Sequence, residues 1–339
     1  MVKKGLFFLL PVLLLFTSAA GAGTKEYEKV YRAAEKEGEV IWVSTLREKE
    51  ADPIVKAFNE EHPKIKATHL RQHGGQAMER LIREVQTGTV TSDIAYIHPD
   101  YLQEFLKLDV IERVDWVKDF NVLPQFVQFD NRFVCPFNGD FLIVYNTNLI
   151  KPEEAPKSWE DLLDPKWKGK FIFDTRPSAF LRLTGAWGPE KTLAYLRKLG
   201  KNQPIFVRGQ TKAATLMAAG DYMMSCAMYL ASYTYVKSKG GPLAISAPDP
   251  FPADQFTFGI LKGAKHPNAA RILNGWLGSK GYKMMEDINW GWSAPFPGSR
   301  KEKIYRGKTI AYPPTPEQVP DRQKYTLEML KAVGARKGK

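Results

Sequence analysis

Cysteine and histidine are scarce in this chain, and the short motifs of several enzyme classes are absent. Only two cysteines and five histidines occur among 339 residues. The sequence contains no G-x-x-x-x-G-K-[ST] loop, no H-E-x-x-H, no G-x-S-x-G and no C-x-x-C. These absences argue against a P-loop nucleotidase, a zinc metalloprotease, an α/β-hydrolase and a dithiol oxidoreductase. The histidines show no spacing typical of a metal site.

Long apolar runs are missing after the first 22 residues, and the one apolar run that exists is short. Lys3 and Lys4 precede an apolar stretch from Gly5 to Phe16, and small residues follow, including Ala20-Gly21-Ala22. This order is typical of a cleavable secretory signal peptide. A membrane anchor is the alternative, but the run has about a dozen residues and a spanning helix needs roughly 20. We expect a signal peptide at 1–22 and export to the periplasm.

The composition is that of an ordinary globular protein of more than one domain. Removing 22 residues from 339 leaves 317, which exceeds the size at which one core usually divides. The net charge of +12 becomes +10 without the two signal lysines, and the basic residues are spread along the chain among glutamates. We therefore expect no nucleic-acid partner and a preference for anionic solutes. Cys135 and Cys226 either pair in the oxidising periplasm or remain as two buried thiols.

Hydrophobic periodicity predicts alternating strands and helices over the first hundred mature residues. Short β-branched stretches predict strands at 39–45, 64–72 and 92–97. Amphipathic stretches predict helices at 24–38, 47–63 and 73–88, and a fourth beginning at 98. This alternation indicates a parallel sheet with helices on its faces. Further along, we expect extended chain at 132–150 and 242–264, helices at 189–200 and 266–287, and a last helix near the C-terminus.

Several segments together resemble one family. The stretch VYNTNLIKPEEAPKSWEDLLDPKWKGKFIF starts at Val144, and EVIWVST, SDIAY, TKAATLMAAGDYMMS and KGAKHPNAARILNGWL occur in matching order. The chain resembles the extracellular solute-binding proteins of ABC importers, in the branch of the periplasmic ferric-iron binders. The resemblance implies an α/β, two-lobed, type II-like periplasmic-binding-protein fold. Each lobe would hold a mixed, mainly parallel sheet flanked by helices, with the ligand in the interlobe cleft.

The same resemblance implies that the chain crosses between the lobes more than once. We expect lobe 1 to comprise 23–133 plus 249–293, and lobe 2 to comprise 134–248 plus 294–339. The hinge strands are expected near 134–140 and 243–248, with a return near 294–299. Closure of such lobes around a solute is a hinge motion.

The iron ligands of that branch are replaced here. Arg47 stands where the iron binders carry histidine, His98 replaces glutamate, and Leu230-Ala231 replaces the tyrosine pair. A cationic arginine repels Fe³⁺, so we expect neither a metal nor another cofactor. A rearranged iron site remains an alternative, because Tyr229 and Tyr233 would meet on one helix face at i, i+4. Core packing is the other interpretation of these tyrosines.

Groups at the predicted strand ends favour an anion instead. The ends fall at 44–47, 73–76, 97–100, 174–179 and 229–233, and ligands of open α/β sheets bind outside such ends. The turn DTRPSAF, from Asp174, would bind an anion through backbone N–H groups, and arginine forks suit carboxylate or phosphate. Solvated surface charge is the alternative for each arginine. The predicted ligand-binding residues are Ser44, Thr45, Arg47, His98, Arg176, Ser178, Ala179, Arg208, Gln210, Tyr229 and Tyr233.

The sequence thus predicts a binding protein that performs no chemistry. We expect a monomeric periplasmic component that captures a small carboxylate, phosphonate, phosphate ester or sulfonate and delivers it to an ABC permease in the inner membrane. A ferric-iron carrier is one alternative. An exported hydrolase using Ser178 and His98 is another, and a ligand-loaded partner of a membrane sensor is a third.

Overall fold

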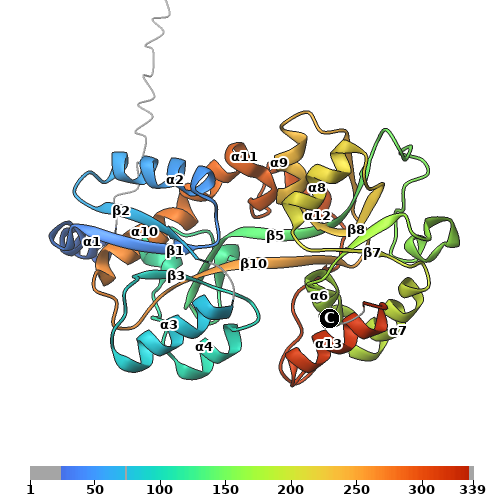
Figure 1. The fold of residues 1–339 in the computed structure, drawn as a ribbon. Helices are drawn as coiled ribbons and strands as arrows, with labels where there is room; N and C mark the ends of the chain where they lie inside the picture. Colours follow the sequence, from blue (N-terminus) through green and yellow to red (C-terminus); the bar gives the residue numbers. More distant parts are fainter. Residues whose placement is uncertain (1–23, 73–74, 336–339) are drawn as a thin grey trace, which may run out of the picture.

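Two α/β regions joined by a pair of long strands make up the protein. The computed structural model describes residues 24–72 and 75–335, and Figure 1 shows the two regions side by side. The predicted signal peptide at 1–22 and the expected strand-end residue His73 lie outside the described residues. Within the described part, no helix combines the length and apolar character that crossing a membrane requires.

The first region, called lobe 1 below, is built on a sheet with the strand order β2-β1-β3-β10. β1 pairs in parallel with both β2 and β3, whereas β10 runs antiparallel to β3. The strands and helices of the N-terminal part are α1 (Lys25–Glu37), β1 (Glu39–Ser44), α2 (Glu48–Glu61), β2 (Lys66–Arg71), α3 (Gly75–Thr87), β3 (Ile94–Ile97), α4 (Leu102–Leu108) and α5 (Trp116–Phe120). The predicted strand–helix alternation is therefore confirmed.

Helices cover both faces of this sheet (Figure 1). One face carries α1, α2 and α10 (Pro267–Ser279), whose buried residues share a core with Trp42 and Phe258 of the strands. The other face carries α3 and α4, whose buried residues pack with Ile97 and Phe133. Amphipathic helices on both faces bury a sheet that is apolar on both sides, which is the arrangement expected for parallel strands.

The second region, lobe 2, repeats this plan around the parallel strands β7, β6 and β8. These strands are β6 (Phe171–Asp174), β7 (Ile205–Val207) and β8 (Met224–Tyr229), and the short strand β9 (Leu243–Ser246) pairs with β5. The helices α6 (Ser178–Trp187), α7 (Pro189–Gly200) and α13 (Arg322–Ala332) contribute to one core, and α8 (Gln210–Ala219) and α9 (Leu230–Lys237) contribute to another.

Two antiparallel strands connect the lobes: β5 (Phe133–Asn146) and β10 (Phe251–Ile260). Figure 1 shows them running together across the middle of the molecule. Along β5, Phe137 belongs to the core of lobe 1 and Phe141 to that of lobe 2. Along β10, Ala253 lies in lobe 2 and Phe256 in lobe 1. The expected first hinge, 134–140, thus falls within β5.

The segment expected as the second hinge, 243–248, lies elsewhere. Its residues Leu243–Ser246 form β9, which pairs with residues 143–146 of β5 inside lobe 2. The second connection is made by β10 instead, because only this strand is long enough to pair with β5 in both lobes. The chain returns a third time through α11 (Met284–Asn289), the turn Trp290–Trp292 and α12 (Arg300–Tyr305).

Both cysteines are buried and free. Cys135 packs in the lobe 1 core with Ile97 and Phe133, whereas Cys226 packs in the lobe 2 core. Of the two possibilities left open by the sequence, the structure has the pair of buried thiols.

Candidate functional site

A cavity of about 490 Å³ lies between the lobes, where strands from both sheets end. Its lining comes from the loops after β1, β3, β6 and β7, from the last residue of β8 and from the connecting strands. The lining residues are Thr45, Gly75, Tyr96, His98, Asp100, Tyr101, Phe141, Asp174, Arg176, Ser178, Arg208, Gln210, Tyr229, Phe256 and Trp292. The carboxyl ends of parallel strands are the usual place for a ligand in such sheets.

The lobe 2 wall carries all the arginines of this lining. β6, β7 and β8 end at Asp174, Val207 and Tyr229, and α6, α8 and α9 begin within a few residues of those ends. Three helix N-termini therefore start at this wall, and their partial positive charge and free N–H groups favour an anion. Arg176 and Arg208 add full positive charge beside them.

The two arginines differ in whether a carboxylate already forms an ion pair with them. Arg176 forms a two-pronged ion pair with Asp174, with Nε–Oδ1 of 3.1 Å and Nη2–Oδ2 of 3.0 Å. Gln210 donates to the same carboxylate over 2.9 Å. The hydrogen bond that Arg176 donates to Asp174 also raises the pKa of Arg176. Arg208, by contrast, forms no ion pair with any residue in 24–72 or 75–335, so its guanidinium is the uncompensated cation of this wall.

The lobe 1 wall has a different chemistry, because no lysine or arginine lines it. It presents the carboxylate of Asp100 and the imidazole of His98 beside aromatic rings. Burial lowers the pKa of His98, although the Asp100 carboxylate opposes this shift; the ring is therefore neutral near pH 7. The aromatic residues on this side are Tyr96, Tyr101, Phe256 and Trp292.

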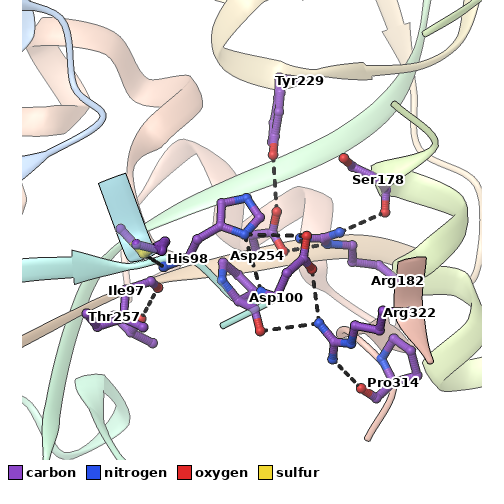
Figure 2. A network of polar contacts seen from close by, with 12 residues as sticks. Ile97, His98, Asp100, Ser178, Arg182, Tyr229, Asp254, Thr257, Pro314 and Arg322 are labelled. Atoms are coloured by element: carbon purple, nitrogen blue, oxygen red, sulfur yellow. Dashed lines mark hydrogen bonds and ion pairs between the residues drawn. The ribbon is translucent and has the colours of Figure 1, made fainter. Parts of the chain in front are cut away.

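A polar network joins the two walls beneath the cavity (Figure 2). Oδ1 of Asp100 lies 3.0 Å from Nη1 of Arg322 and 3.8 Å from Nη2 of Arg182. Arg182 is 1% exposed and donates to Oδ1 of Asp254 over 2.6 Å, and the Tyr229 hydroxyl donates to Oδ2 of Asp254 over 3.1 Å. Burial alone would raise the pKa of Asp100, but Arg182 and Arg322 outweigh it and lower that pKa. The carboxylate is therefore ionised.

Tyr229 is held tightly at the junction of the lobes. Its ring packs on Phe141 and Trp292, with centroids 4.0 and 5.4 Å away. Gly139 of β5 permits this approach, since a Cβ there would lie only 2.9 Å from the Tyr229 ring. Burial and the nearby Asp254 raise the pKa of Tyr229 well above its usual value, so the phenol stays protonated.

Seven of the predicted ligand-binding residues line this cavity, and four do not. Those in the lining are Thr45, His98, Arg176, Ser178, Arg208, Gln210 and Tyr229. Ser44 is fully buried, and its hydroxyl contacts Nε2 of His69 at 2.8 Å and accepts from the Leu46 N–H. Ala179 is buried in the lobe 2 core. The N–H of Ser178 donates to the Arg176 carbonyl, so it serves the turn and not an anion.

Arg47 was expected to be a main anion ligand, and the structure places it outside the cavity lining. Its guanidinium forms an ion pair with Glu50, with Nε–Oε1 of 3.1 Å, and lies 4.7 Å from the ring centroid of Tyr235. The Glu50 side chain also accepts from the Arg47 N–H, which closes the first turn of α2. The Arg47 guanidinium is therefore paired with the carboxylate of Glu50, three residues downstream.

Tyr229 and Tyr233 do not meet on one helix face. Tyr229 is the last residue of β8, and α9 begins only at Leu230. Tyr233 lines a second cavity that shares no residue with the first. The rearranged iron site, as formulated from these two tyrosines, is therefore wrong. Within the described residues, no group of three or more His, Cys, Asp or Glu side chains is arranged to hold a metal ion.

Sequence reasoning missed several residues of this site. Asp100 lay within a predicted strand end but was not selected, and Asp174 was seen only as the start of a turn. Tyr96, Tyr101, Phe141 and Phe256 carry no motif, and aromatic residues are equally typical of a core. The partners Arg182, Asp254 and Arg322 are separated by 68 residues or more, and only the fold brings them together.

Comparison with known proteins identifies the family to which this chain belongs. Residues 53–294 match the family described as bacterial extracellular solute-binding protein. A “Putative 2-aminoethylphosphonate-binding periplasmic protein” of Salmonella typhimurium is 23% identical over 268 residues, which cover 73% of this chain and 75% of that protein. The chain belongs to this family of bacterial extracellular solute-binding proteins.

Solved structures show the same fold. The periplasmic binding protein AfuA of Actinobacillus pleuropneumoniae, with fructose-6-phosphate bound, superposes with a TM-score of 0.70 at 17% identity and covers 88% of this chain and 99% of its own. Iron-bound HitA of Pseudomonas aeruginosa gives a TM-score of 0.67 at 18% identity, covering 87% and 99%. The predicted two-lobed periplasmic-binding-protein fold is confirmed.

Proposed function

We propose that this solute-binding protein captures a small organic anion in the cavity between its lobes. The observation that carries the proposal is the uncompensated charge of Arg208 on a wall where three helices begin. The anionic group would lie against Arg208 and the Ser178 hydroxyl, which both line the cavity. Charge-assisted hydrogen bonds of this kind are about twice as strong as neutral ones.

The two walls together favour an anion that also carries an ammonium group. The lobe 1 wall offers the ionised carboxylate of Asp100 and four aromatic rings but no lysine or arginine. Carboxylates and aromatic faces both attract a cationic nitrogen. A short aminophosphonate fits this pattern, with phosphonate on lobe 2 and ammonium on lobe 1. The name of the Salmonella relative, 2-aminoethylphosphonate-binding, supports the same class.

Capture would depend on the two lobes coming together. The lobes, proposed from the sequence as 23–133 plus 249–293 and 134–248 plus 294–339, would hinge within β5 and β10. A solute that contacts both walls stabilises the closed form, because only that form provides both sets of contacts. We propose that the mature protein, after loss of residues 1–22, carries the solute as a periplasmic monomer to an ABC permease in the inner membrane.

In this proposal the protein releases its solute chemically unchanged. The alternative is that the protein hydrolyses the solute. Ser178 and His98 both line the cavity. No hydrogen bond between them occurs among the described residues, and Nδ1 of His98 accepts from the Asp100 N–H over 3.2 Å. A serine nucleophile needs its base within hydrogen-bond reach. We therefore favour binding without chemistry.

The test is calorimetric titration of the purified protein with 2-aminoethylphosphonate, ethylphosphonate, fructose-6-phosphate and Fe³⁺. We expect 2-aminoethylphosphonate to bind most tightly and to be recovered intact. Arg208→Ala should weaken binding about ten- to hundredfold, because a hydrogen bond to a charged group contributes about 1.5–3 kcal/mol. Arg197→Ala, an exposed arginine of α7 outside the lining, is the matched control.

A second variant tests the ammonium end of the ligand independently of its phosphonate end. Asp100→Asn should weaken 2-aminoethylphosphonate more than ethylphosphonate, since only the former carries an ammonium group. Comparing two ligands on one variant cancels any effect of Asp100 on lobe closure. Binding of Fe³⁺ with no binding of any anion would refute the proposed function, and equal losses for both phosphonates would refute the ammonium subsite.

A further inference from the structure

A second interlobe cavity, of about 590 Å³, lies between α2 and α11 on the lobe 1 side and α9 and α12 on the lobe 2 side. It shares no lining residue with the cavity described above. Figure 1 shows α9 and α11 next to each other at the junction of the two lobes, with α2 extending away over lobe 1. The lining residues are Lys49, Glu50, Tyr233, Thr234, Tyr235, Lys237, Ser238, Lys239, Asp287, Ile288, Asn289, Trp290 and Arg300.

Cationic groups converge on one tyrosine in this cavity. Nζ of Lys49 lies 3.4 Å from the ring centroid of Tyr235, and Nζ of Lys239 lies 4.4 Å from it. Lys239 also donates to the Tyr235 hydroxyl over 2.7 Å. This hydrogen bond, followed by the charge of Lys49, lowers the pKa of Tyr235. With Arg47 at 4.7 Å, three like charges surround a single phenol.

The acidic residues of the cavity do not balance this charge. Four cationic side chains line it, Lys49, Lys237, Lys239 and Arg300, against the carboxylates of Glu50 and Asp287. Glu50 is already engaged, because it pairs with Arg47 and accepts from Asn289 over 3.0 Å. In the described part of the chain, none of the three lysines forms an ion pair. Like charges held this close repel one another unless an anion lies among them.

We propose that this cavity is a second anion site, which takes a multiply charged oxyanion such as a diphosphate. Lysine ammonium groups bind phosphate as point charges, and they reach the cavity from both lobes. Lys49 belongs to α2 of lobe 1, whereas Lys237 is the last residue of α9 in lobe 2 and Lys239 follows two residues later. An oxyanion held by both groups therefore links the lobes, and its binding is coupled to their closure.

The experiment is calorimetric titration with inorganic pyrophosphate at low salt, using the full mature chain. A cleft variant, Arg176→Ala/Arg208→Ala, removes the cationic side chains of the first cavity and should still bind one pyrophosphate. In that background, Lys49→Ala/Lys239→Ala should weaken binding at least about tenfold, and raising the salt concentration should weaken it further. Lys56→Ala, an exposed lysine of α2 outside the cavity, should leave the affinity unchanged.

Two outcomes would overturn this inference. One is the absence of pyrophosphate binding to the cleft variant. The other is equal affinity in the Lys49→Ala/Lys239→Ala and Lys56→Ala variants. Both lysines are exposed, so their loss leaves the folded core unchanged, and a circular dichroism spectrum identical to that of the wild type verifies this. The proposed function does not depend on these outcomes, because its tests use Arg208, Asp100 and phosphonates.

Discussion

The carboxylate of Asp100 and the guanidinium of Arg322 form an ion pair between the lobes, with Oδ1–Nη1 of 3.0 Å. Asp100 follows β3 in lobe 1, and Arg322 is the first residue of α13 in lobe 2. The same guanidinium donates to the Pro99 carbonyl over 3.3 Å. It also donates to the Pro314 carbonyl over 2.6 Å (Figure 2). One arginine therefore ties the wall of the cavity in lobe 1 to the C-terminal segment of lobe 2.

Loss of this tie should open the lobes. Arg322→Ala removes the ion pair with Asp100 and the hydrogen bond to the Pro99 carbonyl, which exist only when the lobes lie this close. We expect a larger radius of gyration in small-angle X-ray scattering of ligand-free protein. Lys324→Ala, an exposed residue two positions along the same helix, should scatter like the wild type. Identical curves for both variants would show that the pair does not hold the lobes together.

A buried ion pair stabilises the connection between the lobes. Lys301 and Asp140 are both fully buried and in contact, and Lys301 also donates to the Asn138 and Gly291 carbonyls. Lys301→Met leaves the Asp140 charge unpaired and should lower the free energy of unfolding by about 3–5 kcal/mol. The double variant Asp140→Asn/Lys301→Met should recover part of this loss, while Asn still accepts from Tyr305. Urea denaturation measures both, and a double variant no more stable than the single one would contradict the prediction.

Stability should fall in mild acid, partly because of His69. Burial lowers the pKa of His69 to about 4, and its Nε2 contacts the Ser44 hydroxyl at 2.8 Å. The unfolded chain, with a histidine pKa near 6.5, binds a proton that the folded protein rejects until about pH 4. The free energy of unfolding therefore decreases as the pH falls through this window.

Substitution isolates this contribution from that of other groups. Burial also lowers the pKa of His62 and His98, which act in the same direction. We expect His69→Gln to lose less in melting temperature between pH 7 and pH 4.5 than the wild type does. Equal losses in the two proteins would mean that His69 is not the responsible group.

The thiols should be inert in the folded protein. Cys135 and Cys226 are each about 1% exposed, and burial raises the pKa of both far above the usual value. The thiolate is the reactive form, so Ellman's reagent should label neither residue in the native state. In denaturant it should label two thiols per chain. Rapid labelling of the native protein, or fewer than two thiols after unfolding, would contradict the assignment.

The local hydrophobic pattern was sufficient to predict most of the helices and strands. The amphipathic stretch 24–38 became α1, capped by the Thr24 hydroxyl at its start and by Gly38, with a φ of 76°, at its end. The fold class followed because strand–helix alternation has few packing solutions. The SWEDLL stretch, part of the family-like segment that starts at Val144, forms only a short 3₁₀ turn at Asp161–Leu163. There the Asp161 carboxylate accepts from the N–H groups of Lys157 and Ser158 and favours a turn.

The cavity residues show where prediction from the sequence stopped. Strand ends located Thr45, His98 and the Arg176 turn because parallel strands end at one edge of a sheet. The same reasoning selected Arg47, since nothing local showed whether its charge would face the cavity or Glu50. The place of Trp292 beside Tyr229 depends on the third passage of the chain between the lobes.

The sequence by itself was sufficient to predict the signal peptide, the alternation of strands and helices, and the family of solute-binding proteins. These properties depend on periodicity and short motifs, which act over a few residues to a few tens of residues. Only the tertiary structure decided which distant charged side chains form ion pairs and which of them face a solute. The pairing of Arg182 with Asp254, 72 residues apart, is set by the fold. The fold also places Asp100 where it both pairs with Arg322 and lines the cavity. Electrostatic pairing depends on distance in space, and that distance is fixed only when the chain has folded.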